Sequence, residues 1–310
     1  MEKVENFDIL YCFDDNYNVQ AITSIISYLD KVEKRQNINI IHTSGSIKDQ
    51  LPDTIKNHKN LQSIKIYEFK DYEYQFPNIE NVHISEATYF RLFIQNYLES
   101  TIKKIVYIDP DVVCAGNPSN IIKSTFDEMK KTNKIISAKT EANSFSKNSD
   151  SLKRLNLSEK YFNAGVMLID YEKWQEIDLT LKLIEELNKI RDKIIFWDQD
   201  VLNSFFNGDY YELDKNLNYT AFDIQDLDEQ ILLIHFLGSK KPWLTSGVFE
   251  SISEIYHLNY RKFNSSAYHI EHKWKLGSIK ELTKAIINFK IKNLSFVSKY
   301  LKEFFLSLRV

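Results

Sequence analysis

The first half of the chain alternates short apolar runs with stretches in which apolar residues recur at helical spacing. Four isoleucine and leucine side chains between residues 22 and 29 follow the i, i+3, i+4, i+7 spacing of a helix that buries one face. We predict a second helix over 84–98, with Ser85 as its N-cap. Continuous apolar runs are typical of buried strands, and they predict strands at 7–13, 38–42, 64–69 and 105–108.

The second half of the chain continues this alternation after an interruption. Residues 141–160 are rich in Ser, Asn and Lys and show weak periodicity, so we interpret them as a mobile loop beside the site. The apolar pair Val201-Leu202 is interpreted as a turn. A helix is predicted at 180–191, and further strands at 162–169 and 231–234. Strands that alternate with helices predict an α/β fold with a mostly parallel central sheet.

The apolar run at 105–108 ends in two aspartates separated by a proline. Successive strand side chains point to opposite faces, so Asp109 and Asp111 share a face. Pro110 lacks the amide proton that strand pairing needs, so regular pairing is expected to end there. Two carboxylates in this position repel each other unless a cation lies between them, and a hard divalent ion that also holds phosphate oxygens fits this role. The alternative is a pair of caps or surface charges at a strand-to-loop turn.

Further polar residues are expected at the same edge of the sheet. In parallel α/β sheets, ligands bind outside the carboxyl ends of the strands. The strand at 7–13 is followed directly by Asp14, Asp15 and Asn16, so these side chains should lie near Asp109 and Asp111. The sequence therefore predicts one polar, acidic binding edge.

Six sequence blocks occur in a characteristic order: Phe13-Asp14-Asp15-Asn16-Tyr17, Thr88-Tyr89-Phe90-Arg91-Leu92, Tyr107-Ile108-Asp109-Pro110-Asp111, Phe162-Asn163-Ala164-Gly165-Val166, Asp198-Gln199-Asp200-Val201-Leu202-Asn203 and His235-Phe236-Leu237-Gly238-Ser239-Lys240-Lys241-Pro242-Trp243. In this order and spacing they resemble the family 8 glycosyltransferases, retaining enzymes that include bacterial lipooligosaccharide galactosyltransferases and glycogenin. The resemblance covers about residues 7–245. It implies a GT-A type nucleotide-sugar-binding fold in residues 1–250, a Mn²⁺ or Mg²⁺ ion, a UDP-sugar donor and an α-linked product.

The resemblance implies that Asp109, Asp111 and His235 are the metal ligands. Two carboxylate oxygens and an imidazole nitrogen, completed by two diphosphate oxygens, suit Mn²⁺ better than Ca²⁺ or Zn²⁺. Four apolar residues precede His235, and on the residues alone a hydrogen-bonded core histidine is the alternative. Gly238 and Lys241, which follow it, favour ligation: Gly238 lets the backbone approach a phosphate, and Lys241 supplies a charge for the leaving diphosphate.

The remaining donor-binding residues also follow from the resemblance. Asp14 and Asn16 match positions that contact uracil or ribose, and Tyr17 is expected near the base; a loop with a helix cap is the alternative. Asn163 and Ala164 are expected to line the donor-sugar pocket, with Gly165 keeping that wall thin.

The expected catalytic residues come from three blocks. Arg91 matches an arginine near the donor sugar and diphosphate, although an exposed position on the predicted helix is the alternative. Asp198 and Gln199 are expected beneath the anomeric carbon: Asp198 bonds sugar hydroxyls, and the Gln199 carbonyl faces the developing positive charge. Asp200 is interpreted as structural. We interpret Phe196, Trp197 and Trp243 as core aromatics.

One position departs from the family pattern. Many members carry an aspartate after the strand that follows the Asp-x-Asp block, where it holds donor-sugar hydroxyls. Here Thr140 stands near the expected place, with Glu141 next to it. The identity of the transferred sugar is therefore left open between galactose and glucose, with a preference for galactose.

The charge distribution adds a second expectation. Residues 273–310 contain eight Lys, one Arg and two Glu, a local charge of +7 in a chain of net charge −3, so the remainder stands at −10. Apolar residues recur at helical spacing among these lysines. We expect residues 251–310 to form a small helical region, in which 273–310 bind an anionic membrane surface. Packing on the catalytic domain or a subunit contact is the alternative.

The sequence contains no recognisable signal peptide or apolar run long enough to span a membrane, so we expect a cytoplasmic protein, peripheral on the inner face of the cytoplasmic membrane. The predicted activity is metal-dependent transfer of a hexose from UDP-galactose or UDP-glucose to a glycan or glycolipid such as lipooligosaccharide. No nucleic-acid partner is expected. The alternatives are a nucleotide-sugar hydrolase, a nucleotidyltransferase, or a non-catalytic carbohydrate-binding or membrane-adaptor protein on a transferase fold.

Overall fold

The computed structural model describes residues 4–71, 74–77, 86–141, 150–158, 160–221, 230–238, 240–244, 246–248 and 250–271, together with residues 298, 301, 302 and 305. All structural statements below concern these residues.

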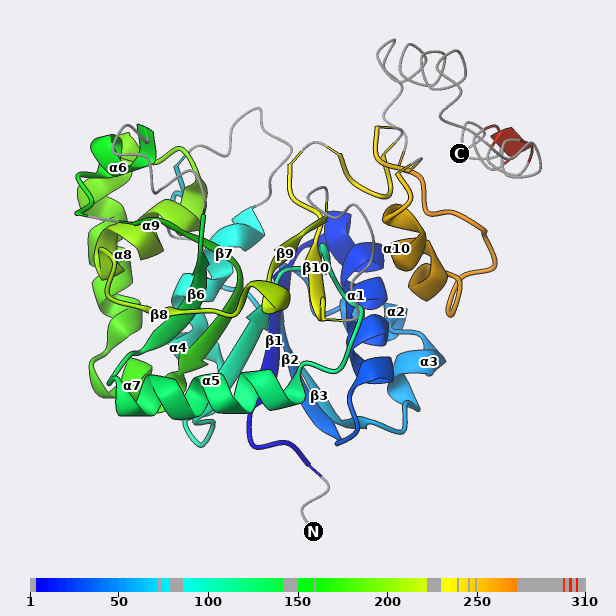
Figure 1. Ribbon diagram of the computed structural model, residues 1–310, viewed down its shortest axis with the longest axis horizontal. Helices are drawn as coiled ribbons and strands as arrows, with labels where there is room; N and C mark the ends of the chain where they lie inside the picture. Colours follow the sequence, from blue (N-terminus) through cyan, green and yellow to red (C-terminus); the bar gives the residue numbers. More distant parts are fainter. Residues whose placement is uncertain are drawn as a thin grey trace.

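The fold is built on a central seven-stranded sheet with strand order β3-β2-β1-β4-β7-β6-β8 (Figure 1). Four of its neighbouring pairs are parallel, while β7 is antiparallel to both of its neighbours, β4 and β6. The predicted mostly parallel α/β sheet is therefore confirmed. Its strands are β1 (Asp8–Phe13), β2 (Gln36–His42), β3 (Leu61–Glu68), β4 (Lys104–Ile108), β6 (Ile136–Thr140), β7 (Phe162–Asp170) and β8 (Tyr211–Glu212).

A second, three-stranded sheet lies beyond the end of β4. It consists of β5 (Val112–Cys114), β10 (Leu233–His235) and β9 (Tyr219–Thr220), with β10 in the middle. The antiparallel β5–β10 pair places His235 opposite Val112, next to Asp111. The sequence predicted only the β10 segment of this sheet, because strands of two or three residues carry almost no periodic signal.

Helices cover both faces of the central sheet and bury two large apolar clusters (Figure 1). On one face, α1 (Asn18–Lys31) and α5 (Ser119–Lys131) pack their apolar sides against β1, β2 and β4. On the other face lie η2 (Glu86–Phe93), α4 (Ile94–Tyr97), α7 (Tyr171–Glu176), α8 (Leu179–Ile190) and α9 (Trp197–Phe206). Shorter elements are η1 (Asp15–Tyr17), α2 (Ile47–Gln50), α3 (Asp53–Lys56), α6 (Asp150–Leu155), η4 (Arg191–Lys193) and η5 (Lys215–Leu217).

Three sequence interpretations need correction. The predicted helix at 84–98 is mostly the 3₁₀ segment η2, followed by one α-helical turn, and its proposed cap Ser85 lies outside the described residues. Within the predicted loop at 141–160, residues 150–155 form helix α6. Val201 and Leu202 are no turn: they are buried inside α9, whose first turn carries the acidic residues Asp198 and Asp200, a favourable position relative to the helix dipole.

Residues after 250 pack on the same core as far as Glu271. Helix α10 (Ser253–Tyr260) contributes to an apolar cluster with β10 and Trp243. The Glu271 amide donates to the Trp243 carbonyl at 2.8 Å, and Gln20 on α1 donates to the Glu271 carboxylate at 2.5 Å. The division at residue 250 stays a prediction, and nearly all of the basic stretch 273–310 lies outside the described part of the chain. None of the helices described here combines the length and apolarity required to traverse a bilayer.

We predict that deletion of residues 264–310 destabilises the protein more than deletion of 272–310. Only the longer deletion removes the Glu271 contacts and the bond between His269 Nδ1 and the Tyr256 hydroxyl, 2.7 Å long. Loss of these bonds costs about 1 kcal/mol each, which corresponds to a melting temperature lower by about 5 °C or more. Thermal unfolding of the two shortened proteins measures the difference. Equal melting temperatures would show that residues 264–271 contribute nothing to the core.

Candidate active site

The turn after β4 brings the two aspartates together, as the sequence predicted. The Asp109 amide donates to the Gly165 carbonyl on β7 at 2.8 Å, one residue beyond the last β4–β7 pair, Ile108 and Val166. The Val112 amide then donates back to the Asp109 carbonyl at 3.1 Å, so the chain reverses tightly around Pro110. Ligand atoms of Asp109, Asp111 and His235 all lie within 4.8 Å of one another.

The hydrogen bonds of His235 determine which ring nitrogen faces the carboxylates. Asn163 Oδ1 accepts from the Gly165 amide at 3.0 Å, and it also accepts from Asn218 Nδ2 at 2.9 Å. Asn218 therefore presents its Oδ1 to His235 Nδ1, 2.9 Å away, so Nδ1 carries the proton. In the neutral ring, Nε2 then directs its lone pair towards Asp111 Oδ1, at 3.2 Å. Such support of a histidine through its second nitrogen is typical of metal ligands.

These residues fit a divalent cation. Asp111 Oδ1 is buried and receives no hydrogen bond from the described residues. It therefore stands beside an imidazole lone pair and a second carboxylate, an arrangement of acceptors that a cation stabilises. Two carboxylates and one imidazole are a ligand set suited to Mn²⁺.

Arg91 connects the aspartates to helix α9. Its guanidinium is 5% exposed, so the alternative of a solvent-exposed arginine is wrong. It forms a buried ion pair with Asp198, lies 3.5 Å from Asp109, and donates to the Ala164 carbonyl at 2.5 Å. Burial raises the pKa of Asp109, and the Arg91 charge opposes this shift. Burial likewise raises the pKa of Asp198 to about 7 against the effect of Arg91.

Lys241 lies on the other side of the metal ligands. Its ammonium donates to Asp111 Oδ2 and to the Phe236 carbonyl, both at 2.5 Å. Burial by itself raises the pKa of Asp111, but its charged surroundings, first of all the Lys241 ammonium, hold that pKa below its usual range. Gly238 has φ +74°, a conformation that suits glycine. Lys241 thus contacts the candidate metal ligand Asp111, while the approach of Gly238 to a phosphate stays a prediction.

The residues expected to bind the donor sugar lie on strand β7 and in the first turn of α9. Because β7 is antiparallel to β4, Asn163 and Ala164 at its amino end reach the edge at which β4 ends. The Ala164 amide donates to Gln199 Oε1 at 3.0 Å. A side chain at Gly165 would place its Cβ 2.0 Å from His235 Cε1, so only glycine leaves room for the imidazole.

Glu141 is a site residue that the sequence did not assign. Its carboxylate accepts from Asn163 Nδ2 at 3.4 Å and from Gln199 Nε2 at 3.3 Å. Thr140, the position we had considered first, points elsewhere, because its hydroxyl bonds Tyr210 and Glu212. Burial raises the pKa of Glu141, while the Asn163 and Gln199 bonds oppose this shift. The sequence does contain a signal for this residue: Glu141 is the carboxylate next to Thr140, where many family members carry an aspartate.

The expected nucleotide-binding residues follow β1 directly. Asp14 caps the turn η1 by accepting from the Asn16 amide at 3.1 Å, and its second oxygen accepts from the Asn16 side chain at 2.8 Å. The cap considered as an alternative is therefore present. The Tyr17 ring packs edge-on against Trp243, with centroids 6.2 Å apart. Burial raises the pKa of Tyr17, and the charge of Asp111 adds to it, which reflects their proximity.

The aromatic residues near α9 differ from expectation in one case. Trp243 is buried, and Trp197 packs partly buried against the core, as predicted. Phe196, in contrast, is 45% exposed, so its assignment to the core is wrong. Asp200 is fully buried and bonded to Arg154 by two hydrogen bonds, which agrees with a structural role.

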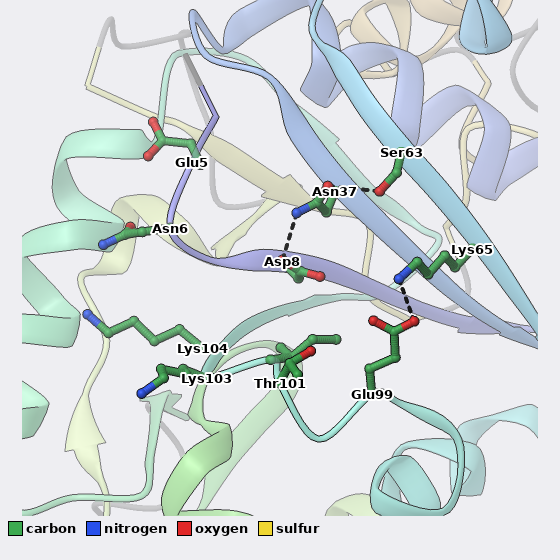
Figure 2. A pocket seen from close by; sticks show the side chains of 11 residues that line it. Glu5, Asn6, Asp8, Asn37, Ser63, Lys65, Glu99, Thr101, Lys103 and Lys104 are labelled. Carbon is green, nitrogen blue, oxygen red and sulfur yellow. Dashed lines mark hydrogen bonds and ion pairs between the residues drawn. The ribbon is translucent and has the colours of Figure 1, made fainter. Parts of the chain in front are cut away.

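Figure 2 shows a separate cavity of ≈ 360 Å³ at the opposite edge, where β1 to β4 begin. Two of its lysines are already paired with carboxylates: Lys65 lies 2.6 Å from Glu99, and Lys103 lies 2.9 Å from Glu172. Asp8 accepts from Asn39 at 2.9 Å and from Asn37 at 3.2 Å. These pairs do not converge on a common ligand, so the metal-ligand cluster, and not this cavity, is the candidate active site.

The arrangement of the sheet and its helices is a fold of the GT-A type. The solved structure of galactosyltransferase LgtC in complex with donor and acceptor sugar analogs matches with a TM-score of 0.67 and 20% sequence identity. The match covers 89% of this chain and 100% of that chain. The predicted GT-A fold is therefore confirmed.

A family model described as glycosyl transferase family 8 matches residues 8–247, so the chain belongs to glycosyltransferase family 8. General stress protein A of Bacillus subtilis (strain 168) is 26% identical over 294 residues, which cover 86% of this chain and 97% of that protein. A lipopolysaccharide 1,3-galactosyltransferase of Salmonella typhimurium (strain LT2) is 33% identical over 175 residues, 53% of this chain and 51% of that protein. The predicted family membership and glycosyltransferase activity are confirmed.

We predict that Gly165→Ala weakens Mn²⁺ binding by at least about 10-fold, because the new methyl group displaces the imidazole of His235. Gly45→Ala is the matched control, since its Cβ would have no neighbour nearer than 4.0 Å. Electron paramagnetic resonance of free Mn²⁺ during titration measures both affinities. Wild-type affinity in Gly165→Ala would contradict the assignment of His235 as a ligand.

Proposed function

We propose that the protein transfers a hexose, galactose or glucose, from a UDP-sugar to a glycan acceptor with retention of configuration. The observation that carries this proposal is the cluster of Asp109, Asp111 and His235 beside Lys241, in a chain of family 8. The cluster would hold Mn²⁺ or Mg²⁺, which supplies charge stabilisation for the departing diphosphate. Asp14, Asn16 and Tyr17 would bind the uridine, and Gly238 would let the backbone approach the diphosphate.

The residues around the anomeric carbon favour front-face attack. Asp198 is held by Arg91, and Asp200 is buried against Arg154, so neither carboxylate is presented as a nucleophile. Lys241 and Arg91 would stabilise negative charge on the departing diphosphate, and a diphosphate oxygen would accept the acceptor's proton as that hydroxyl attacks from the same face. The product is then α-linked.

The donor sugar would lie against Asn163, Ala164 and Gln199, with Glu141 beneath it. Two hydrogen bonds link Glu141 to this wall, so its carboxylate is placed to accept from sugar hydroxyls. The relatives named above include a galactosyltransferase, which supports galactose as the first donor to test.

The acceptor we propose is a lipooligosaccharide or another cell-surface glycan. The Salmonella typhimurium relative is named for lipopolysaccharide, and the basic stretch 273–310 would hold the protein at an anionic membrane where such acceptors are assembled. The full-length protein should sediment with anionic vesicles in a salt-sensitive way. Loss of this sedimentation on deletion of 272–310 would support the peripheral location, and unchanged sedimentation would exclude it.

The alternative activity, a nucleotide-sugar hydrolase, would release UDP at the same rate with and without acceptor.

We predict that UDP release from UDP-galactose or UDP-glucose requires Mn²⁺ or Mg²⁺. Chelation should abolish turnover, and Mn²⁺ should restore it. Asp109→Asn or Asp111→Asn should lower the rate at least about 10²-fold, since each removes a main electrostatic element. A panel of UDP-sugars with and without metal measures this, and NMR of the product gives the linkage. Full activity in chelator would refute the role of the metal. A β-linked first product would refute the retaining mechanism.

We predict that Glu141→Gln lowers kcat/KM for the preferred donor by about 10-fold or more, because it replaces a charged hydrogen-bond acceptor by a neutral amide of nearly the same size. Mn²⁺ affinity should stay unchanged. Glu128→Gln, on the exposed side of α5, is the control. If Glu141→Gln changes neither kcat/KM nor the ratio of activities with UDP-galactose and UDP-glucose, Glu141 does not contact the donor sugar.

A further inference from the structure

The side chain of Gln199 is held by three hydrogen bonds. Its Oε1 accepts from the Ala164 amide at 3.0 Å. Its Nε2 donates to the Tyr161 hydroxyl at 3.2 Å and to Glu141 at 3.3 Å. A backbone amide can only donate, so the bond to Ala164 fixes Oε1 on the side of the donor-sugar wall.

The direction of the bond between Gln199 and Tyr161 is set by a third residue. The Tyr161 hydroxyl lies 2.8 Å from Asp200 Oδ1, and a carboxylate accepts the hydroxyl proton. With its proton directed to Asp200, the Tyr161 oxygen is an acceptor for Gln199 Nε2. Burial keeps the pKa of Tyr161 well above its ordinary value, so the hydroxyl retains the proton that this arrangement needs.

Asp200 is itself held firmly as an acceptor. Arg154 on α6 donates to both of its oxygens, at 2.8 and 3.1 Å. The amides of Ile195 and Phe196 donate to Oδ2 at 2.7 and 2.8 Å. Asp200 is fully buried, so a competing solvent contact is excluded and its oxygens are used by these donors.

We propose that Tyr161 is a positioning residue for Gln199: by donating to Asp200 and accepting from Nε2, it holds the Gln199 amide in the orientation in which Oε1 bonds Ala164 on the donor-sugar side. The proposal rests on the proposed function, since it takes the Gln199 carbonyl to stabilise the developing positive charge. Arg154 on α6 holds Asp200, Asp200 accepts from Tyr161, and Tyr161 accepts from Gln199. In this proposal none of the first three contacts the substrate; they act only through Gln199.

Tyr161→Phe tests the proposal, because it removes the hydroxyl and keeps the ring. Tyr171→Phe is the matched control: this tyrosine is also buried and hydrogen-bonded, but to the carbonyls of Ile94 and Leu98. In full-length protein labelled with ¹⁵N-glutamine, the Gln199 side-chain amide signals are assigned by their loss in Gln199→Ala. We expect Tyr161→Phe to speed exchange of these amide protons at least about fivefold, and Tyr171→Phe to leave it unchanged.

Kinetics with the preferred donor then distinguish a loss of Gln199 positioning from a general destabilisation of the protein. Tyr161→Phe should lower kcat about tenfold while KM for the donor changes less than about twofold, as expected for loss of one hydrogen bond that acts in the transition state. In a Gln199→Ala background, Tyr161→Phe should cause no further loss, because it acts only through Gln199.

The outcomes are distinguishable. Unchanged Gln199 exchange in Tyr161→Phe overturns the proposal whatever the activity. Faster exchange with wild-type kcat, or full additivity with Gln199→Ala, also overturns it. A wild-type protein that releases UDP from no donor refutes the proposed function instead, and in that case the exchange measurement still decides whether Tyr161 holds Gln199.

Discussion

The candidate site depends on the repulsion between two carboxylates that the fold brings together and on the positive charges that offset it. A tight turn around Pro110 holds the carboxylates of Asp109 and Asp111 at one place with limited access to solvent. Such a pair is unfavourable unless positive charge surrounds it. Arg91 supplies that charge beside Asp109, and Lys241 supplies it beside Asp111. In the proposed mechanism, the charges that stabilise the folded site also stabilise the anionic leaving group.

Strand direction explains how residues distant in sequence meet at this edge. Parallel strands β1 and β4 bring their carboxyl ends there, which the sequence pattern predicted. Antiparallel β7 brings its amino end to the same place, and the small sheet of β5 and β10 adds His235. Because of these two reversals of direction, the proposed sugar-binding wall on β7 and the candidate metal ligand His235 both reach the edge at which β1 and β4 end.

The residues that were predictable are those with local signals. The β–α alternation and the Asp109–Asp111 pair followed from periodicity, and His235, Arg91 and Gln199 followed from the resemblance. Asn218, Tyr161 and Arg154 were missed because their roles arise only from tertiary hydrogen bonds. Between Thr140 and Glu141 the sequence could not decide, because only tertiary hydrogen bonds distinguish them: Thr140 bonds Tyr210 and Glu212, whereas Glu141 bonds Asn163 and Gln199.

The position of His235 has a consequence for protein synthesis. Asp109, Asp111 and Arg91 leave the ribosome well before the segment that carries Asn218 and His235, so a growing chain holds an acidic, incomplete cluster while residues 112–234 are added. Because β10 must pair with β5 before the imidazole reaches the carboxylates, a competent metal site exists only once the catalytic fold has closed. In the proposed metal site, capture of the ion therefore requires a completed catalytic fold.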